Sequence, residues 1–169
     1  LTGDGIRRTR LHDYRGNRVD LDGMRYLPHA VFTTLVFKLT GHRPPLPWLG
    51  FRGIRRLDAL IQPSWRILEF GSGTSTVWFS KRARQIVSIE HDRQWFEQVS
   101  QRLARSGLHN VDLRLHSPDD YASLEEADGS FDLAIVDGLS RARAARVAVG
   151  AVHSGGWVYL DNCDVQDAD

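Results

Sequence analysis

The stretch Ile67-Leu68-Glu69-Phe70-Gly71-Ser72-Gly73 decides the fold. Its apolar residues predict a short buried strand over 66–70, and two glycines follow where the chain must turn. A second short apolar run, at 86–89, ends in Glu90, 21 residues beyond Glu69. Two buried strands, each followed by polar or glycine residues, indicate a sheet whose functional residues lie just beyond the strand ends.

The same alternation continues to the end of the chain. Amphipathic stretches that predict helices separate short apolar runs that predict strands. The expected strands are 66–70, 86–89, 111–115, 131–136 and 157–160, and the expected helices are 75–83, 92–107 and 140–152. Strands that alternate with helices predict an α/β fold with a mainly parallel sheet covered on both faces.

Residues 1–63 follow a different pattern and are expected to form an N-terminal arm, with residues 64–169 as the core. The arm begins with a polar stretch rich in Arg and Asp. Helices are predicted at 29–39 and 52–61, on either side of a stiff Pro-rich connector at 44–48. Their apolar faces need burial, so we expect them to pack on the core or to cover the mouth of its site.

Composition excludes several classes of protein. The chain has 169 residues, of which 41% are hydrophobic and 25% are charged, which is ordinary for a globular domain. No apolar run reaches the length of roughly 18 residues that a membrane helix needs. A single cysteine, Cys163, excludes an intrachain disulfide framework and a cysteine-based zinc site. No secretory signal is visible, so a cytoplasmic location is expected.

The charge of the chain is unevenly distributed. Residues 1–66 hold 12 basic and five acidic side chains, a net charge of +7, whereas residues 67–169 carry −6. The basic arm either docks on the acidic core or attracts an anionic partner such as nucleic acid. The absence of an aromatic-rich RNA-binding signature favours docking over a nucleic-acid partner.

The glycine turn and Glu90 together predict a ligand site. Gly71 and Gly73 let the backbone turn tightly and approach a ligand, although a plain strand-to-helix turn has the same pattern. The third glycine of a dinucleotide fingerprint would fall at Thr76, which argues against a nicotinamide or flavin site. Glu90 can accept hydrogen bonds from both hydroxyls of a ribose. The pair therefore predicts a site for a nucleoside-containing ligand.

Four segments in this order resemble the motifs of class I S-adenosylmethionine-dependent methyltransferases. The similarity spans residues 65–164, and the segments are 67–73, Ser88-Ile89-Glu90, Phe131-Asp132-Leu133-Ala134-Ile135-Val136-Asp137-Gly138 and Gly155-Gly156-Trp157-Val158-Tyr159-Leu160-Asp161-Asn162. The chain is most similar to bacterial members of unassigned substrate, whose pattern includes an aromatic residue after the second strand, here Trp95. Their pattern also includes an Asp-Gly-x-x-Arg segment, here Asp137, Gly138 and Arg141. The resemblance implies a Rossmann-like three-layer sandwich.

The resemblance also implies a role for each residue of the predicted site. Glu69 would orient the methionine amino group through the loop or a water, and Asp137 would lie where the methyl group leaves. The remaining cofactor-binding candidates follow the first three strands: Gly71, Ser72 and Gly73 against the methionine and ribose, Glu90 on the ribose hydroxyls, His91 beside the adenine, and Asp119 near the adenine amino group. Two plainer interpretations are that Asp137 caps a helix and that His91 is an exposed turn residue.

A metal site is a further alternative. Asp137, Asp161 and Asn162 follow adjacent strands and resemble the metal set of catechol-type O-methyltransferases. Three oxygen ligands of this kind suit Mg²⁺ or Ca²⁺. Against this, Arg141 would repel a cation, and the two residues after the fifth strand are of the type that hydrogen-bonds loop backbone.

The predicted function is therefore methyl transfer from S-adenosylmethionine to a small-molecule acceptor. The open alternatives are an S-adenosylmethionine-binding protein without transferase activity and another Rossmann-like enzyme, such as an aminopropyltransferase or a nicotinamide enzyme. The family usually adds two strands after the fifth, and the chain stops eight residues after Asp161. We therefore expect a longer protein whose C-terminal strands are missing from this sequence.

Overall fold

The chain divides into two compact units, Leu1–Pro44 and Pro45–Asp169. The computed structural model describes residues 24, 27–40, 46–47 and 49–161. In the first unit, helix α2 (Leu27–Thr40) includes the predicted helix at 29–39. Most of the Pro-rich connector, together with Asn162 and Cys163, lies outside the described residues. How residues 1–44 pack therefore stays a prediction. The predicted helix at 52–61 belongs to the second unit as helix α3 (Phe51–Leu60), which packs on the sheet as expected.

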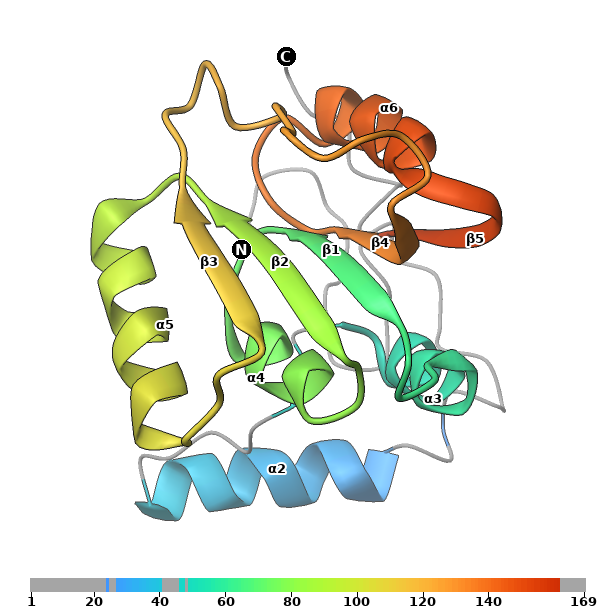
Figure 1. Ribbon diagram of the computed structural model, residues 1–169. Helices are drawn as coiled ribbons and strands as arrows, with labels where there is room; N and C mark the ends of the chain where they lie inside the picture. Colours follow the sequence, from blue (N-terminus) through green and yellow to red (C-terminus); the bar gives the residue numbers. More distant parts are fainter. Residues whose placement is uncertain (1–23, 25–26, 41–45, 48, 162–169) are drawn as a thin grey trace, which may run out of the picture. The chain divides into compact units, whose positions relative to one another are not determined.

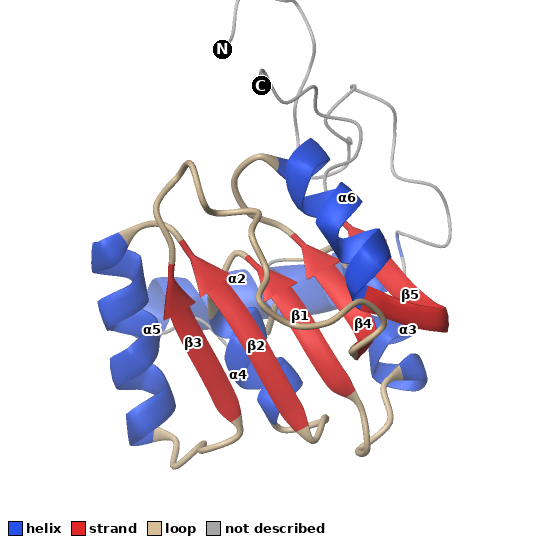
Figure 2. Cartoon of the chain, turned by 45° about the horizontal axis from the view of Figure 1, so that its top comes forward, coloured by secondary structure: helices blue, strands red, loops and turns tan. Residues whose placement is uncertain are grey.

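The second unit is built on a five-stranded sheet in the order β3-β2-β1-β4-β5, in which every neighbouring pair of strands is parallel (Figures 1 and 2). The strands are β1 (Arg66–Phe70), β2 (Gln85–Glu90), β3 (Val111–Leu115), β4 (Phe131–Val136) and β5 (Val152–Leu160). The predicted α/β fold with a parallel sheet is confirmed. Strands β2 and β4 lie on opposite sides of β1 in the sheet. A crevice is therefore expected at the carboxyl end of β1, where the strand order reverses.

Helices cover both faces of the sheet and complete three layers. The helices are α3 (Phe51–Leu60), α4 (Thr74–Ser80), α5 (Arg93–Arg105) and α6 (Arg141–Ala151). On one face, Leu57 of α3 and the aromatic residues of α4 pack against Leu133 and Ile135. On the other face, α6 packs on β4 and β5 (Figure 2). Its buried residues are alanines at helical spacing, which let the helix approach the sheet closely.

Helix α5 begins with a capping residue, as its sequence predicts. The Asp92 side chain accepts a hydrogen bond from the Trp95 backbone amide at 2.8 Å. Val99 and Leu103 then recur on one face and are buried against Val77 of α4. The cap fixes where the helix starts, and therefore where its first-turn residue Trp95 lies.

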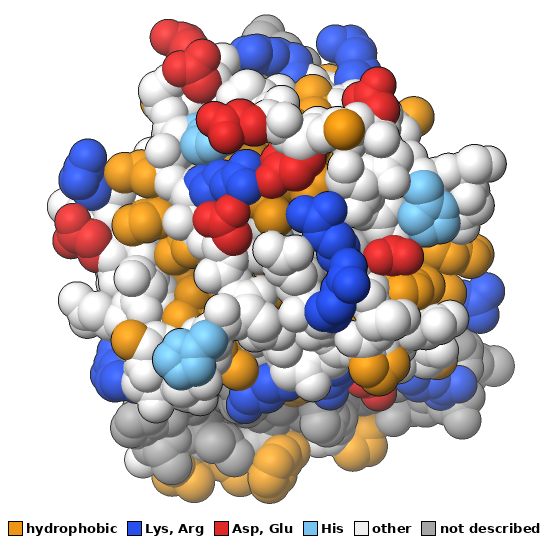
Figure 3. All heavy atoms as spheres, viewed as in Figure 1, with side chains coloured by type: hydrophobic (Ala, Val, Ile, Leu, Met, Phe, Trp, Pro, Cys, Tyr) orange, Lys and Arg blue, Asp and Glu red, His pale blue; other side chains and the backbone are white. Residues whose placement is uncertain are grey.

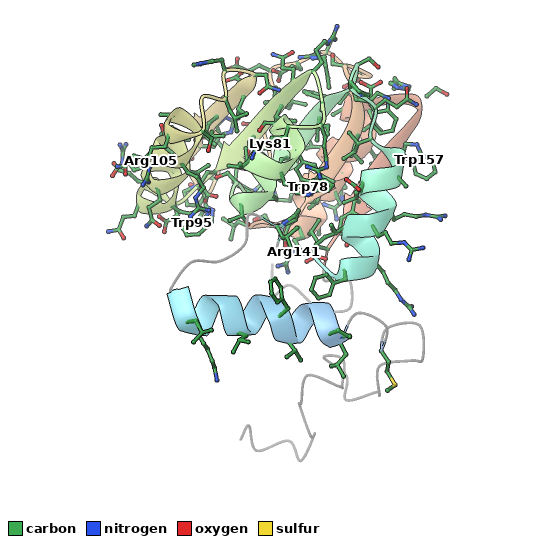
Figure 4. The ribbon with its side chains drawn as sticks, turned by 90° about the horizontal axis from the view of Figure 1, so that it is seen from below. Trp78, Lys81, Trp95, Arg105, Arg141 and Trp157 are labelled. Atoms are coloured by element: carbon green, nitrogen blue, oxygen red, sulfur yellow. The ribbon has the colours of Figure 1, made fainter. Side chains whose placement is uncertain are left out.

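Strand β5 is longer than the sequence predicts. It begins at Val152 rather than at residue 157, and its pairing with β4 shifts between Phe131 and Leu133. Gly155, within the irregular part, has a φ of +86°. The glycines at 155 and 156 give this segment the sequence of a turn, whereas the chain continues through it as an irregular strand. Trp157 follows on the strand and is half-exposed (Figure 4).

Opposite charges are paired on the surface of the second unit. Arg114 contacts Asp112 at 2.6 Å and Glu126 at 2.5 Å, and Arg82 contacts Asp58 at 2.7 Å. On the face shown in Figure 3, described basic and acidic side chains are interspersed. Because seven of the 11 basic side chains of residues 1–63 lie outside the described residues, the nucleic-acid alternative stays a prediction.

Candidate functional site

The polar residues that follow the strands lie side by side at one end of the sheet. The Asp137 amide donates to the Phe70 carbonyl at 2.9 Å, and the Asp161 amide donates to the Val136 carbonyl at 3.0 Å. The Gly71 amide likewise donates to the Ile89 carbonyl at 2.9 Å. These bonds continue the ladders just past the ends of β1, β4 and β5. They bring residues up to 90 positions apart in sequence to one edge.

The two glycines of the turn are required for different reasons. Gly71 has a φ of +98°, and a Cβ there would lie 2.8 Å from the Asp137 carbonyl oxygen. Gly73 has extended backbone with a φ of 178°. A Cβ there would lie 3.7 Å from Ser75 Oγ and 3.9 Å from Trp95, which are ordinary contacts. Gly71 is therefore needed by the fold itself, whereas the protein has room for a side chain at position 73.

The buried carboxylate of Glu69 is connected to the glycine turn by hydrogen bonds. Glu69 Oε2 accepts hydrogen bonds from Thr76 Oγ1 at 2.6 Å and from Ser88 Oγ at 2.7 Å. The Thr76 hydroxyl in turn accepts the Gly73 amide at 2.9 Å. The other carboxylate oxygen, Oε1, is buried and has no hydrogen-bond partner. Burial raises the pKa of Glu69 to about 7, although the surrounding hydroxyl groups oppose the rise.

This raised pKa makes the stability of the free protein depend on pH. The carboxyl is protonated more readily in the folded than in the unfolded chain, so its contribution is present at low pH and is lost as pH rises through about 7. Between pH 5 and pH 8 we expect Glu69 to lower the free energy of unfolding by about 2–3 kcal/mol. Glu69→Gln should lack this part of the loss. Urea unfolding of both proteins at the two pH values measures the difference; parallel losses would contradict the assignment.

Glu90 is the centre of a second hydrogen-bond network. Its Oε2 accepts from the Ser72 amide at 3.2 Å and the Ser72 hydroxyl at 3.1 Å. Its Oε1 accepts from the His91 amide at 2.8 Å and the Asp92 amide at 2.9 Å. The side chain is almost fully buried. In the free protein Glu90 therefore joins the glycine turn to the start of α5.

Trp95 also joins these two segments. Its indole Nε1 donates to the Ser72 carbonyl at 2.6 Å, and its ring passes beside Gly73. The ring is partly exposed and lies at the α5 end of the unit (Figure 4). The sequence pattern points to this aromatic residue but not to its contact with the turn.

Of the two residues predicted to lie near the adenine, His91 contacts Glu90 and Asp119 lies on an exposed loop. His91 Nδ1 lies 3.0 Å from Glu90 Oε1, and the ring packs edge-on against Tyr121 at 5.4 Å. Asp119 is exposed, and its backbone carbonyl accepts a hydrogen bond from Arg143 at 3.0 Å. The structure therefore places His91 within the Glu90 network and Asp119 on the loop after β3.

Asp137 and Asp161 form an acidic pair at the ends of β4 and β5. Burial and then the charge of Asp161 raise the pKa of Asp137 to about 6, and the nearby Arg141 opposes this rise. The Tyr159 hydroxyl donates to Asp161 Oδ1 at 3.3 Å. Within the described residues, no three His, Cys, Asp or Glu side chains converge as metal ligands. Asn162, the third member of the predicted metal set, lies outside those residues.

Three residues of the site were not predicted from the sequence. Thr76 departs from the dinucleotide glycine pattern because its hydroxyl joins Glu69 to Gly73. Ser88 is the one polar residue in the buried run 86–89 of β2, and a hydroxyl in such a run is a usable signal. Tyr121 lies in a loop without periodicity, where no signal identifies it.

A cavity of about 260 Å³ lies elsewhere, between α3 and the outer strand β5. It is lined mainly by apolar side chains, among them Leu57, Leu60, Leu133 and Trp157. Leu133 and Trp157 are paired near the middle of their strands rather than at the carboxyl ends. The cavity therefore lies away from the strand ends, although Tyr159, whose hydroxyl donates to Asp161, also lines it.

Comparison with known families identifies the class of protein. A family model described as a methyltransferase domain matches residues 68–163, which is more than half of the chain. The chain therefore belongs to this methyltransferase domain family, and the predicted class I methyltransferase resemblance is confirmed. No curated protein matches the sequence.

Solved structures share the fold at low sequence identity. The YcgJ protein of Bacillus subtilis is 21% identical with a TM-score of 0.54, covering 64% of this chain and 48% of that one. Phosphoethanolamine N-methyltransferase 1 of Haemonchus contortus, in complex with phosphoethanolamine and S-adenosylhomocysteine, is 18% identical with a TM-score of 0.52, covering 65% and 26%. The [4+2]-cyclase SpnF is 19% identical with a TM-score of 0.53, covering 82% and 58%. The chain spans less than two thirds of each of these proteins.

In the described part of the chain, no helix is long and apolar enough to cross a membrane.

Proposed function

We propose that the chain binds S-adenosylmethionine at the carboxyl ends of β1, β2 and β4 and transfers its methyl group to a small-molecule acceptor. The observation that carries this proposal is the glycine turn held by two buried carboxylates, Glu69 and Glu90. Membership of the methyltransferase domain family supports it. The Haemonchus contortus enzyme, which shares the fold, holds S-adenosylhomocysteine and a small molecule.

The charges of the site fit this ligand. At neutral pH S-adenosylmethionine carries a positive sulfonium, a positive amino group and a negative carboxylate, so its net charge is positive. Glu69 and Glu90 are buried, and Asp137 lies at the adjacent strand end. The negative charges of all three carboxylates raise the pKa of Tyr121. A cationic ligand offsets their mutual repulsion, and the unpartnered Glu69 Oε1 offers one more acceptor.

Each predicted residue then has a defined task. Glu69 fixes the Gly73 amide through Thr76 and so shapes the surface for the methionine part. Glu90 accepts the ribose hydroxyls, with Ser72 Oγ as the contact that they can replace. His91 borders the adenine, and Asp119 is the candidate for its amino group.

Catalysis requires mainly alignment. The sulfonium of S-adenosylmethionine supplies a methyl group that is already activated, so the protein's main task is to hold the acceptor in line with it. Asp137 is the candidate catalytic residue because it follows β4 at the edge of the site. With a pKa of about 6, its carboxylate is largely ionised at neutral pH and can take a proton from a hydroxyl acceptor.

Isothermal titration calorimetry tests the proposal directly. We expect S-adenosylmethionine and S-adenosylhomocysteine to bind, and nicotinamide cofactors not to bind. Gly73→Val should abolish binding because the new side chain takes the space of the ligand, whereas the protein itself accepts a Cβ there. We expect its thermal midpoint to stay close to that of the unchanged protein. Normal affinity in Gly73→Val, or no binding by the unchanged protein, would overturn the proposal.

The fold leaves a second function open. The [4+2]-cyclase SpnF shows that a chain of this fold carries an activity named for something other than methyl transfer. If the chain binds S-adenosylmethionine without transferring its methyl group, incubation with an acceptor panel yields no S-adenosylhomocysteine. A chelator added to the same panel tests the predicted metal set of Asp137, Asp161 and Asn162.

A further inference from the structure

Tyr121 is a buried residue of the site to which the proposed function assigns no task. It lies in the loop between β3 and β4, and its side chain has no exposed surface. The hydroxyl oxygen is buried beside the Leu139 backbone and has no hydrogen-bond partner of good geometry. A buried hydroxyl that lacks a well-formed hydrogen bond adds little to stability, so the stability of the fold alone does not explain this group.

The Tyr121 side chain contacts residues at the carboxyl ends of three other strands. It packs against Phe70, the last residue of β1, at 5.8 Å, and against His91, the first residue after β2, at 5.4 Å. Its hydroxyl lies against Gly138, two residues after β4, so closely that a Cβ at Gly138 would overlap it. Because Tyr121 itself follows β3, one side chain connects the carboxyl ends of four strands.

These contacts determine the position of Asp137. Its amide is fixed to the Phe70 carbonyl at 2.9 Å, and Gly138 lies between the Tyr121 hydroxyl and Gly71. A Cβ at Gly138 would also lie 3.0 Å from the Gly71 Cα. The turn after β4 is thus confined between the glycine turn on one side and Tyr121 on the other. Only a residue without a side chain fits at position 138.

The surroundings of the hydroxyl exclude an acid–base role. Burial and the negative charges of Glu90, Glu69 and Asp137 raise the pKa of Tyr121 far above its ordinary value, although the Leu139 backbone opposes the rise. The phenol therefore keeps its proton throughout the neutral range. Its contribution to the site must come from where it holds its neighbours.

We propose that Tyr121 is a positioning residue of the methyl-transfer site, which sets the Asp137–Gly138 turn against the glycine turn and His91. This inference rests on the proposed function and adds a residue to it. Tyr121 fixes the spacing between the nucleoside end of the site, at Glu90 and His91, and the transfer end, at Asp137. Gly138 is the matching residue that accepts the phenol.

Two leucine variants separate positioning from packing. Tyr121→Leu removes the ring from the site, and Phe131→Leu removes an equally buried ring of the same core cluster at the opposite end of β4. Both should lower the thermal midpoint. Only Tyr121→Leu should also weaken S-adenosylhomocysteine binding by calorimetry, by tenfold or more. Equal affinity in the two folded variants would overturn the proposal.

The Tyr121–Gly138 contact supplies a rescue test. Gly138→Ala should weaken binding because the added methyl group overlaps the phenol oxygen and displaces the turn. Tyr121→Phe keeps the ring, so we expect less than a threefold loss of affinity and a thermal midpoint that does not fall. The double variant Tyr121→Phe/Gly138→Ala should bind at least threefold more tightly than Gly138→Ala. The rescue is partial because the ring carbon Cζ still lies 2.9 Å from the new Cβ.

The outcomes distinguish this inference from the proposed function. If the unchanged protein does not bind S-adenosylhomocysteine, the proposed function fails and the inference fails with it. If it binds and the double variant shows no recovery, only the positioning role fails. If Tyr121→Leu does not fold, the Gly138→Ala pair decides alone.

Discussion

Replacing Glu90 with glutamine is expected to weaken S-adenosylhomocysteine binding by at least about a hundredfold. Glutamine keeps one oxygen but puts an amide group where the other oxygen accepts two hydrogen bonds. Either the amide and hydroxyl of Ser72 or the amides of His91 and Asp92 then face a donor instead of an acceptor. The variant loses the predicted ribose acceptor and the order of the loops around it. Calorimetric titration of both proteins at one pH measures the change.

Glu97 offers a matched control for this experiment. It is an exposed carboxylate on α5, outside the network. Glu97→Gln changes the net charge by the same amount and should leave the affinity within a factor of two. If Glu90→Gln behaved like Glu97→Gln, the ribose-binding role of Glu90 would be wrong.

Gly71→Ala is expected to lower the free energy of unfolding by about 3–5 kcal/mol. Two costs add at this position. A side chain is strained at a φ of +98°, and its Cβ would press on the Asp137 carbonyl at 2.8 Å and the Gly138 Cα at 2.9 Å. Both opposing groups are backbone atoms that cannot rotate away. Urea unfolding followed by tryptophan fluorescence measures the loss.

Gly73→Ala supplies the contrast two residues away. Its backbone is extended, and the new Cβ makes only ordinary contacts with Ser75 and Trp95. We expect a change in stability below about 1 kcal/mol. Equal losses in the two variants would mean that the turn does not depend on the conformation of Gly71.

The positions of the strands along the chain could be predicted because the sequence pattern that marks a strand is local. Runs such as Ile86-Val87-Ser88-Ile89 are too short for helices and are bounded by polar residues, so their period and length suffice. The N-terminal part of β5 could not be predicted this way. Its glycines at 155 and 156 are typical of a turn, and only pairing with β4 shows that the segment belongs to the sheet.

The sequence predicts the individual residues of the candidate site whose chemistry is evident from residue type and position. Glu69, Gly71 and Glu90 stand directly after or within strands, where topology makes acids and glycines informative. The links between them depend on backbone amides and on distant side chains. No local pattern shows that Ser72 and the residues after β2 share one carboxylate, or that Tyr121 reaches Gly138. The geometry of the network appears only when strands from different parts of the chain are adjacent.

The position of β1 between β2 and β4 has a consequence for how the molecule folds. Strand β1 pairs with β2 about 19 residues away, at Arg66 and Gln85, but with β4 about 66 residues away, at Ile67 and Leu133. Closing the longer loop costs about 1 kcal/mol more chain entropy. The Glu69 and Glu90 networks are complete once β1, α4, β2 and the start of α5 have formed. During synthesis the nucleoside half of the site can therefore assemble before the ribosome has delivered the segment that carries Asp137.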